Sequence, residues 1–187
     1  MKAKTLKVIL IHGNGGSTAD DIWFPYVKNE LTKLGICVIS KTFPDNELAR
    51  QEHWLPFLKN ELQADKDTIL IGCSSGAVAA MRFAEKNKIY GSILIGASYT
   101  DLDEEKERQS GYFDEPWDWE LIKRNQNWVV QFASTDDPYI PISEPRYIHK
   151  KLNSDYQEYN DRGHFGWDKE LIEFPELIEI IKEKLSL

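Results

Sequence analysis

The chain has 187 residues, of which 41% are hydrophobic and 29% charged, a balance typical of a globular protein rather than a disordered one. Its 23 basic and 31 acidic residues give a formal net charge of −8, which argues against nucleic-acid and anionic-membrane partners. The length predicts a single domain over residues 1–187. The two cysteines, Cys37 and Cys73, cannot build a disulfide framework and favour a reducing, cytoplasmic location.

Short apolar runs alternate with longer amphipathic stretches along the chain. None approaches the roughly 18 apolar residues that span a bilayer, and the first run lacks the features of a secretory signal. Strands are predicted at residues 6–12, 36–41, 68–73, 92–97, 128–133 and 155–159. Helical patterns cover residues 22–34, 47–62, 75–86, 116–124, 143–152 and 175–185. This alternation predicts an α/β/α sandwich with a mostly parallel sheet, whose chemistry lies at the carboxyl ends of its strands.

A nucleophile motif follows the third predicted strand. Residues 72–76 read G-C-S-S-G and precede a helical run, which is the context that a G-x-S-x-G nucleophile elbow requires. The elbow would expose the hydroxyl of Ser74 and aim the backbone N–H of Ser75 at the position where an oxyanion forms. A purely structural turn is the alternative, because the short pattern also occurs by chance.

An acid and a base follow the last two predicted strands. Asp136 and Asp137 come after the fifth strand, and we favour Asp137, directly before Pro138, as the residue that orients a histidine. His164 lies in a glycine-flanked loop after the sixth strand. The order Ser74, Asp137, His164 is the one found in α/β-hydrolases.

The first predicted strand ends in a glycine-rich loop, H-G-N-G-G at residues 12–16. In a hydrolase of this kind the loop supplies the second oxyanion N–H, from either Asn14 or Gly15. Its spacing does not match the dinucleotide-binding or phosphate-binding glycine motifs, and no metal-ligand spacing is recognisable elsewhere. We therefore expect neither a cofactor nor a metal.

An acidic, aromatic stretch follows the fourth predicted strand, and we expect a short lid-like insertion over residues 99–126. Residues 101–120 hold nine acidic and two basic side chains. Aromatic residues of this stretch and one after the first loop could wall a substrate pocket: Trp23, Tyr112, Phe113 and Trp117. Alternatively, the aromatic side chains complete the core and the charges form a solvated helix face.

Several strings together resemble one family. They are G-N-G-G at 13–16, W-L-P-F at 54–57, residues 72–81, S-G-Y-F at 110–113 with P-W-D-W at 116–119, S-T-D-D-P at 134–138 and G-H-F at 163–165. The chain resembles the small serine hydrolases of the retinoblastoma-binding-protein-nine type and the related bacterial YdeN-like hydrolases.

This resemblance implies a minimal α/β-hydrolase fold without a large cap, with strand order 2-1-3-4-5-6 and a Ser74–Asp137–His164 triad. It also supports Asp137 over Asp136. The mammalian L-x-C-x-E motif corresponds here to L-Q-A-D-K at residues 62–66, so binding of retinoblastoma-type pocket proteins is not expected. The family often has histidine before the nucleophile, where this chain has Cys73, which we interpret as a packing residue.

We therefore expect a serine hydrolase that cleaves small carboxylic esters, thioesters or amides through an acyl-enzyme. One alternative is an aminopeptidase-like amide hydrolase whose acidic insertion receives a substrate ammonium group. Another is a non-catalytic binding protein on a hydrolase fold. The expected partner is a small-molecule or peptide substrate.

Overall fold

A central parallel sheet organises the computed structural model, which describes residues 6–187. Its strands run in the order β2-β1-β3-β4-β5-β6, and every neighbouring pair is parallel. They are β1 (Lys7–Ile11), β2 (Cys37–Ser40), β3 (Thr68–Cys73), β4 (Gly91–Ile95), β5 (Val129–Ser134) and β6 (Asp155–Tyr159). The predicted fold class, strand positions and strand order are confirmed.

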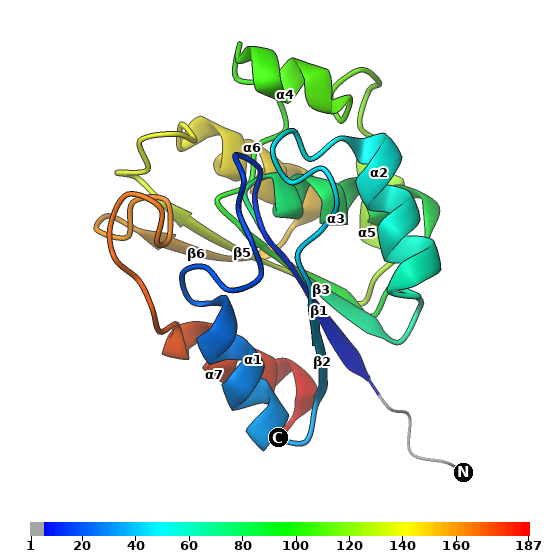
Figure 1. Cartoon of the computed structure of the whole chain (residues 1–187), viewed down its shortest axis with the longest axis vertical. Helices are drawn as coiled ribbons and strands as arrows, with labels where there is room; N and C mark the ends of the chain where they lie inside the picture. Colours follow the sequence, from blue (N-terminus) through cyan, green and yellow to red (C-terminus); the bar gives the residue numbers. More distant parts are fainter. Residues whose placement is uncertain (1–5) are drawn as a thin grey trace.

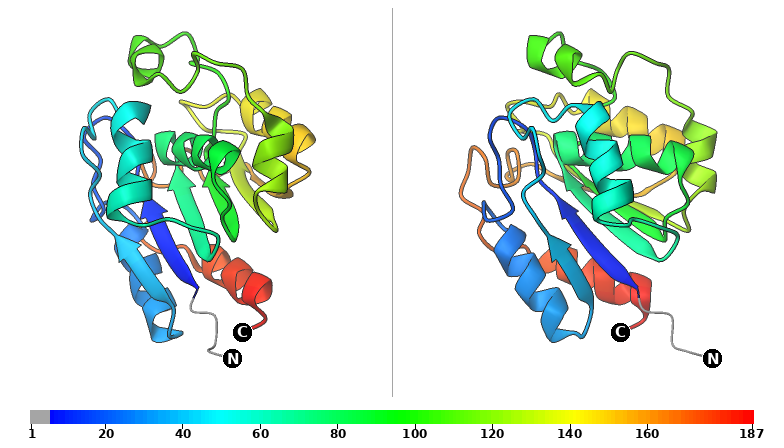
Figure 2. Two further views of the ribbon diagram at one scale, coloured as in Figure 1. Left: turned by 90° about the vertical axis from the view of Figure 1, so that its right-hand side faces the viewer. Right: turned by 45° about the vertical axis from the view of Figure 1, so that its right-hand side comes forward.

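Helices cover both faces of this sheet (Figure 1). One face carries α1 (Phe24–Lys33) and α7 (Pro175–Leu185), which also contact each other. The opposite face carries α2 (Gln51–Pro56), α3 (Ser75–Lys86), α5 (Trp119–Arg124) and α6 (Ser143–Leu152). Figure 2 shows the short α4 (Glu105–Ser110) standing beyond the carboxyl ends of the strands, apart from both layers.

Two apolar clusters, one on each face, explain why the strand sequences read as continuous apolar runs. Every residue of β3, β4 and β5 is buried, because these strands lie in the interior of the sheet beneath helices on both sides. The edge strands β2 and β6 are only partly buried. Burial on both faces fixes the sheet, and the loops at its carboxyl edge are therefore held on a rigid base.

The main differences from the predicted helical patterns lie at residues 47–62 and in the acidic stretch, while α1 and α5 begin at Phe24 and Trp119 instead of at residues 22 and 116. The stretch predicted as a helix from residue 47 begins only at Gln51, because Ala49 has a positive φ of 55° and Arg50 is extended. It then continues as a π-helical turn, η1 (Phe57–Glu61). The acidic stretch contains α4, which was not predicted as a helix. Among residues 6–187, no helix combines the length and apolar character needed to cross a membrane.

Candidate active site

Ser74 occupies a sharp turn between β3 and α3. Its φ of 56° is unusual for a residue with a side chain, and its N–H donates to the Ile95 carbonyl at the end of β4 (2.9 Å). A Cβ at Gly72 would overlap the Gly76 backbone, and one at Gly76 would overlap the carbonyl of Ile11. The two glycines therefore allow the close approach that a nucleophile elbow needs, as the pattern predicts.

His164 and Asp137 contact each other above the neighbouring strands. The His164 Nδ1 lies 2.6 Å from the Asp137 Oδ2, and both side chains are at most 5% exposed. A carboxylate only accepts hydrogen bonds, so Nδ1 carries the proton and Nε2 is left as the acceptor nitrogen. The second oxygen of Asp137 accepts the N–H groups of Tyr139 and Ile140, each at 2.9 Å. The carboxylate is thus held in place from both sides.

The neighbouring Asp136 contacts the loop of His164 rather than its ring. Its Oδ1 accepts hydrogen bonds from the Ser134 hydroxyl (2.5 Å) and the Gly163 N–H (3.0 Å), and its Oδ2 pairs with Lys169. The Lys169 ammonium and the Ser134 hydroxyl lower the pKa of Asp136 to about 2. These contacts favour Asp137 as the partner of His164 and give Asp136 a role in holding the loop.

The loop after β1 runs directly beside Ser74, since a Cβ at Gly13 would lie 3.3 Å from the Ser74 Cβ. The N–H of Gly15 donates to the Glu47 carbonyl (3.1 Å), whereas the N–H of Asn14 has no acceptor among the described residues. Of the two residues expected to supply the second oxyanion donor, Asn14 is therefore the one whose N–H is uncommitted. Ser75 begins α3, so its N–H has no intrahelical partner either.

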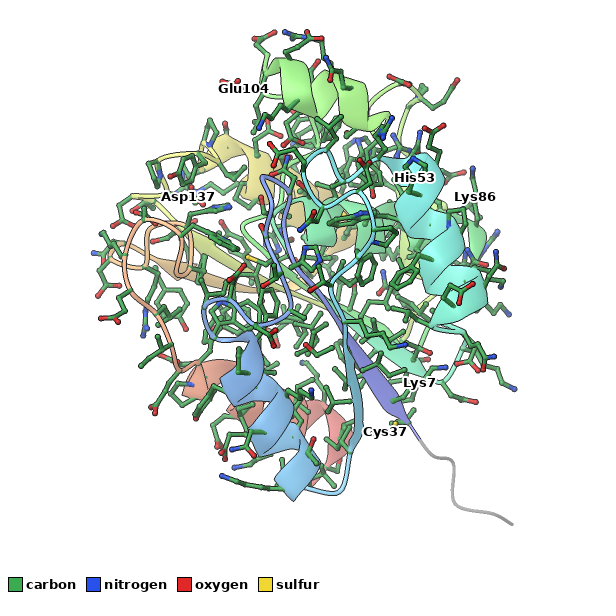
Figure 3. The ribbon with its side chains drawn as sticks, in the orientation of Figure 1. Lys7, Cys37, His53, Lys86, Glu104 and Asp137 are labelled. Carbon is green, nitrogen blue, oxygen red and sulfur yellow. The ribbon has the colours of Figure 1, made fainter. Side chains whose placement is uncertain are left out.

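Ser74 and His164 line one cavity of about 560 Å³ at the carboxyl edge of the sheet. Its other walls come from the loop after β1, from α4 and the residues before it, and from the loops that follow β5 and β6. Figure 3 places Glu104 and Asp137 at this end of the molecule and Lys7 and Cys37 at the opposite end. The volume suits a small substrate.

One acidic side chain of α4 enters this cavity. Glu107 lines its wall, and the Glu107 Oε1 accepts a hydrogen bond from the Asn14 Nδ2 (2.7 Å). Burial raises the pKa of Glu107, nearby Glu104 and Asp101 add to that effect, and the Asn14 amide opposes it. Glu107 therefore brings an acidic side chain of α4 into contact with the loop after β1.

The four aromatic residues expected at the pocket are not among the residues that line the cavity. Trp23 is fully buried, and its Nε1 donates to the Phe165 carbonyl next to His164 (2.9 Å). Tyr112 is fully buried against α3, and Phe113 packs on the same core cluster. Trp117 lies under the Arg82 guanidinium, 3.6 Å from ring centroid to Cζ.

Arg82 accounts for the positions of Tyr112 and Trp117. It also donates to the Tyr112 and Glu115 carbonyls (2.7 and 2.5 Å), which fastens the insertion to α3. The expected pocket role of the four residues is thus replaced by packing.

The cavity is also lined by residues that the sequence patterns do not predict as site residues: Leu102, Glu107, Tyr139, Ile140 and Trp167. Tyr139 and Trp167 follow Asp137 and His164 by two and three positions, so their nearness in sequence was an available signal. No sequence signal distinguishes Glu107, because it is one of nine acidic residues in residues 101–120.

A reactive cysteine and a bound metal ion are two other possible sources of chemistry at the site. Burial raises the pKa of the Cys73 thiol to about 12, so it stays protonated and fits the packing role that was predicted for it. Within the described part of the chain, no group of three or more His, Cys, Asp or Glu side chains could hold a metal ion.

Known proteins resemble this chain in both sequence and fold. A family model described as serine hydrolase matches residues 8–183. The chain is 42% identical to the serine hydrolase RBBP9 of Rattus norvegicus over 186 residues, 98% of each chain. The crystal structure of the ydeN gene product from B. subtilis superposes with a TM-score of 0.89, at 23% identity over 98% of this chain and 100% of that one. The structure of an esterase from Pyrococcus furiosus, Pf2001, superposes with a TM-score of 0.65 at 18% identity, over 97% of this chain and 81% of the esterase chain. The chain belongs to the serine hydrolase family.

Proposed function

We propose that this serine hydrolase cleaves small carboxylic esters, thioesters or amides through an acyl-enzyme, with Ser74 as nucleophile, His164 as base and Asp137 as its orienting acid. The observation that carries the proposal is the contact between the His164 Nδ1 and the Asp137 Oδ2, 2.6 Å long. It leaves the His164 Nε2 free to accept a proton in the cavity that Ser74 also lines.

The reaction follows from these positions. His164 takes the hydroxyl proton of Ser74 as the oxygen attacks the substrate carbonyl, and the positive charge on the ring is stabilised by Asp137. The N–H groups of Ser75 and Asn14 donate to the oxyanion of the tetrahedral intermediate. His164 then gives its proton to the leaving group, which departs and leaves Ser74 acylated. A water molecule, deprotonated by the same ring, hydrolyses the acyl-enzyme and restores the hydroxyl.

Labelling with a fluorophosphonate probe tests the nucleophile, because this probe forms a covalent bond with an activated serine. The expected result is stoichiometric labelling of the wild type, with none of Ser74→Ala and none of heat-denatured wild type. Folded wild type that stays unlabelled would refute Ser74 as an activated nucleophile and favour a binding protein on the hydrolase fold.

A second candidate, an aminopeptidase-like hydrolase, is favoured by one observation. Glu104 and Glu107 both line the cavity, opposed there by Lys106, so a substrate ammonium would meet a net negative wall. Comparing kcat/KM for p-nitrophenyl acyl esters and for aminoacyl arylamides separates the two. Faster turnover of arylamides with a free amino group than of their N-acetylated forms would establish the second candidate.

A further inference from the structure

The side chain of Glu107 joins α4 to the loop after β1. This helix stands apart from the two layers that cover the sheet, as Figures 1 and 2 show. Two consecutive residues before it, Leu102 and Asp103, have positive φ values of 56° and 59°, and Gly111 after it has a φ of 78°. The helix therefore begins and ends at sharp changes of chain direction, and the Glu107–Asn14 hydrogen bond connects it to the cavity wall.

Several polar groups of the turn around Asn14 are bonded to other parts of the chain. The Asn14 carbonyl accepts hydrogen bonds from the N–H and the hydroxyl of Ser17, and the Gly15 N–H donates to the Glu47 carbonyl. The Asn14 side chain donates to Glu107. The Asn14 N–H, to which the proposed function assigns the second oxyanion contact, has no acceptor among the described residues. The bonds to the Asn14 carbonyl and side chain hold this residue from two sides, so the direction of its N–H is restricted.

We propose that Glu107 is a positioning residue that holds the Asn14 side chain and thereby fixes the Asn14 N–H for the oxyanion. This inference rests on the proposed function. It gives α4 a definite part in the reaction, because Glu107 holds the side chain of Asn14 while Ser17 holds its carbonyl. It also explains why Glu107 of α4 contacts the cavity wall while Glu105 of the same helix stays exposed and bonds to Arg108 and Gln109.

The chemistry of the two side chains suits this role. A carboxylate only accepts, so it selects the orientation of the Asn14 amide in which the Nδ2 points at α4. An oxyanion donor must be placed before the charge develops, because a donor that has to reorient during the reaction loses most of its effect. Loss of a complete donor in a comparable hydrolase costs about 10²–10³-fold in kcat, so a donor left in place but loosened should cost less.

Four variants test the inference by hydrolysis of a p-nitrophenyl ester: Glu107→Ala, Glu107→Gln, Asn14→Ala and the double variant Asn14→Ala/Glu107→Ala. Glu105→Ala is the matched control, since it removes an acid from the same helix without touching Asn14. Asn14→Ala keeps its backbone N–H. Thermal melting of each variant shows that it is folded under the assay conditions.

We expect Glu107→Ala to lower kcat about tenfold with KM changed by less than about twofold, because an oxyanion contact acts in the transition state. Glu107→Gln should restore most of kcat, since its carbonyl oxygen still accepts from Asn14. Asn14→Ala should match Glu107→Ala, and the double variant should lose no more than either, as expected for two residues that act through one bond.

Three results would overturn the inference. They are equal kinetics for Glu107→Ala and Glu105→Ala, multiplied losses in the double variant, and a raised KM with unchanged kcat, which would mean that Glu107 binds the substrate directly. If the wild type shows no hydrolysis, or hydrolysis that persists in Ser74→Ala, both the proposed function and this inference are overturned. Active wild type with any of the three results overturns the inference alone.

Discussion

Replacing each of two adjacent aspartates with asparagine separates orientation of the base from support of its loop. In Asp137→Asn the Oδ1 can still accept the N–H groups of Tyr139 and Ile140, so the new amide places its NH₂ against the His164 Nδ1. Two donors cannot face each other, so the ring must shift its proton to Nε2. The ring then has no acceptor for the proton of Ser74.

The expected loss in kcat is up to about 10⁴-fold, or about 5 kcal/mol of barrier, since both side chains are nearly inaccessible to water that could substitute for them. In Asp136→Asn the amide oxygen still accepts from Ser134 and Gly163, and only the ion pair with the half-exposed Lys169 is lost. That variant should keep kcat within about tenfold of the wild type, because exposed ion pairs contribute little.

Steady-state kinetics with a p-nitrophenyl ester, together with urea unfolding, measures both effects. Asp137→Asn should lose activity while its free energy of unfolding stays near that of the wild type, because the variant keeps the backbone hydrogen bonds of the loop. A larger kcat loss in Asp136→Asn than in Asp137→Asn would refute the assignment of the acid. Equal, small losses would refute the proton-transfer role of His164.

The pH dependence of Asp136→Asn and two further variants probe the support of the site. Asp136 has its pKa lowered from 3.8 to about 2, so its contribution to stability is complete above about pH 4 and lost as the pH falls toward 2. Asp136→Asn should therefore be about 1 kcal/mol less stable at neutral pH, after allowing for solvent screening, and equally stable in acid unfolding near pH 2. Gly96→Ala would place a Cβ 2.9 Å from the His164 Cε1 at a φ of 56°, so we expect about 100-fold lower kcat and about 1–2 kcal/mol less stability. Arg82→Met leaves the buried Glu85 unpaired and should cost about 3–5 kcal/mol in urea unfolding.

The sheet was predictable because burial on both faces imposes a local, continuous pattern. The run at β3 is apolar at successive positions, and the glycines around Ser74 record close backbone approaches that no other residue permits. Such constraints act within a few residues of the chain and can be read from it. The order of Ser74, Asp137 and His164 added the expectation that three strand ends carry the chemistry.

The walls of the cavity at Ser74 and His164 were not predictable in the same way, because they depend on contacts between distant segments. Trp117 and Tyr112 are aromatic residues of the kind that often line a pocket. Their segment packs against α3 instead, because it contacts Arg82, which lies about 30 residues earlier in the chain. Glu107 enters the cavity because Asn14, 93 positions earlier, meets it there. Neither of these long-range contacts produces a periodic pattern in the sequence.

Three aspartates near His164 have different hydrogen-bond partners and therefore different structural roles. Asp137 accepts from the ring, Asp136 accepts from the Gly163 N–H, and Asp168 accepts from the His164 N–H at 2.6 Å. Asp136 and Asp168 accept from two consecutive backbone N–H groups, those of Gly163 and His164, so they fix the position of the backbone that carries the ring. Asp137 fixes the orientation of the ring itself. Replacing either loop aspartate should therefore disturb the position of the ring without changing its tautomer. Activity lost in this way should follow the stability of the loop, whereas activity lost at Asp137 should not.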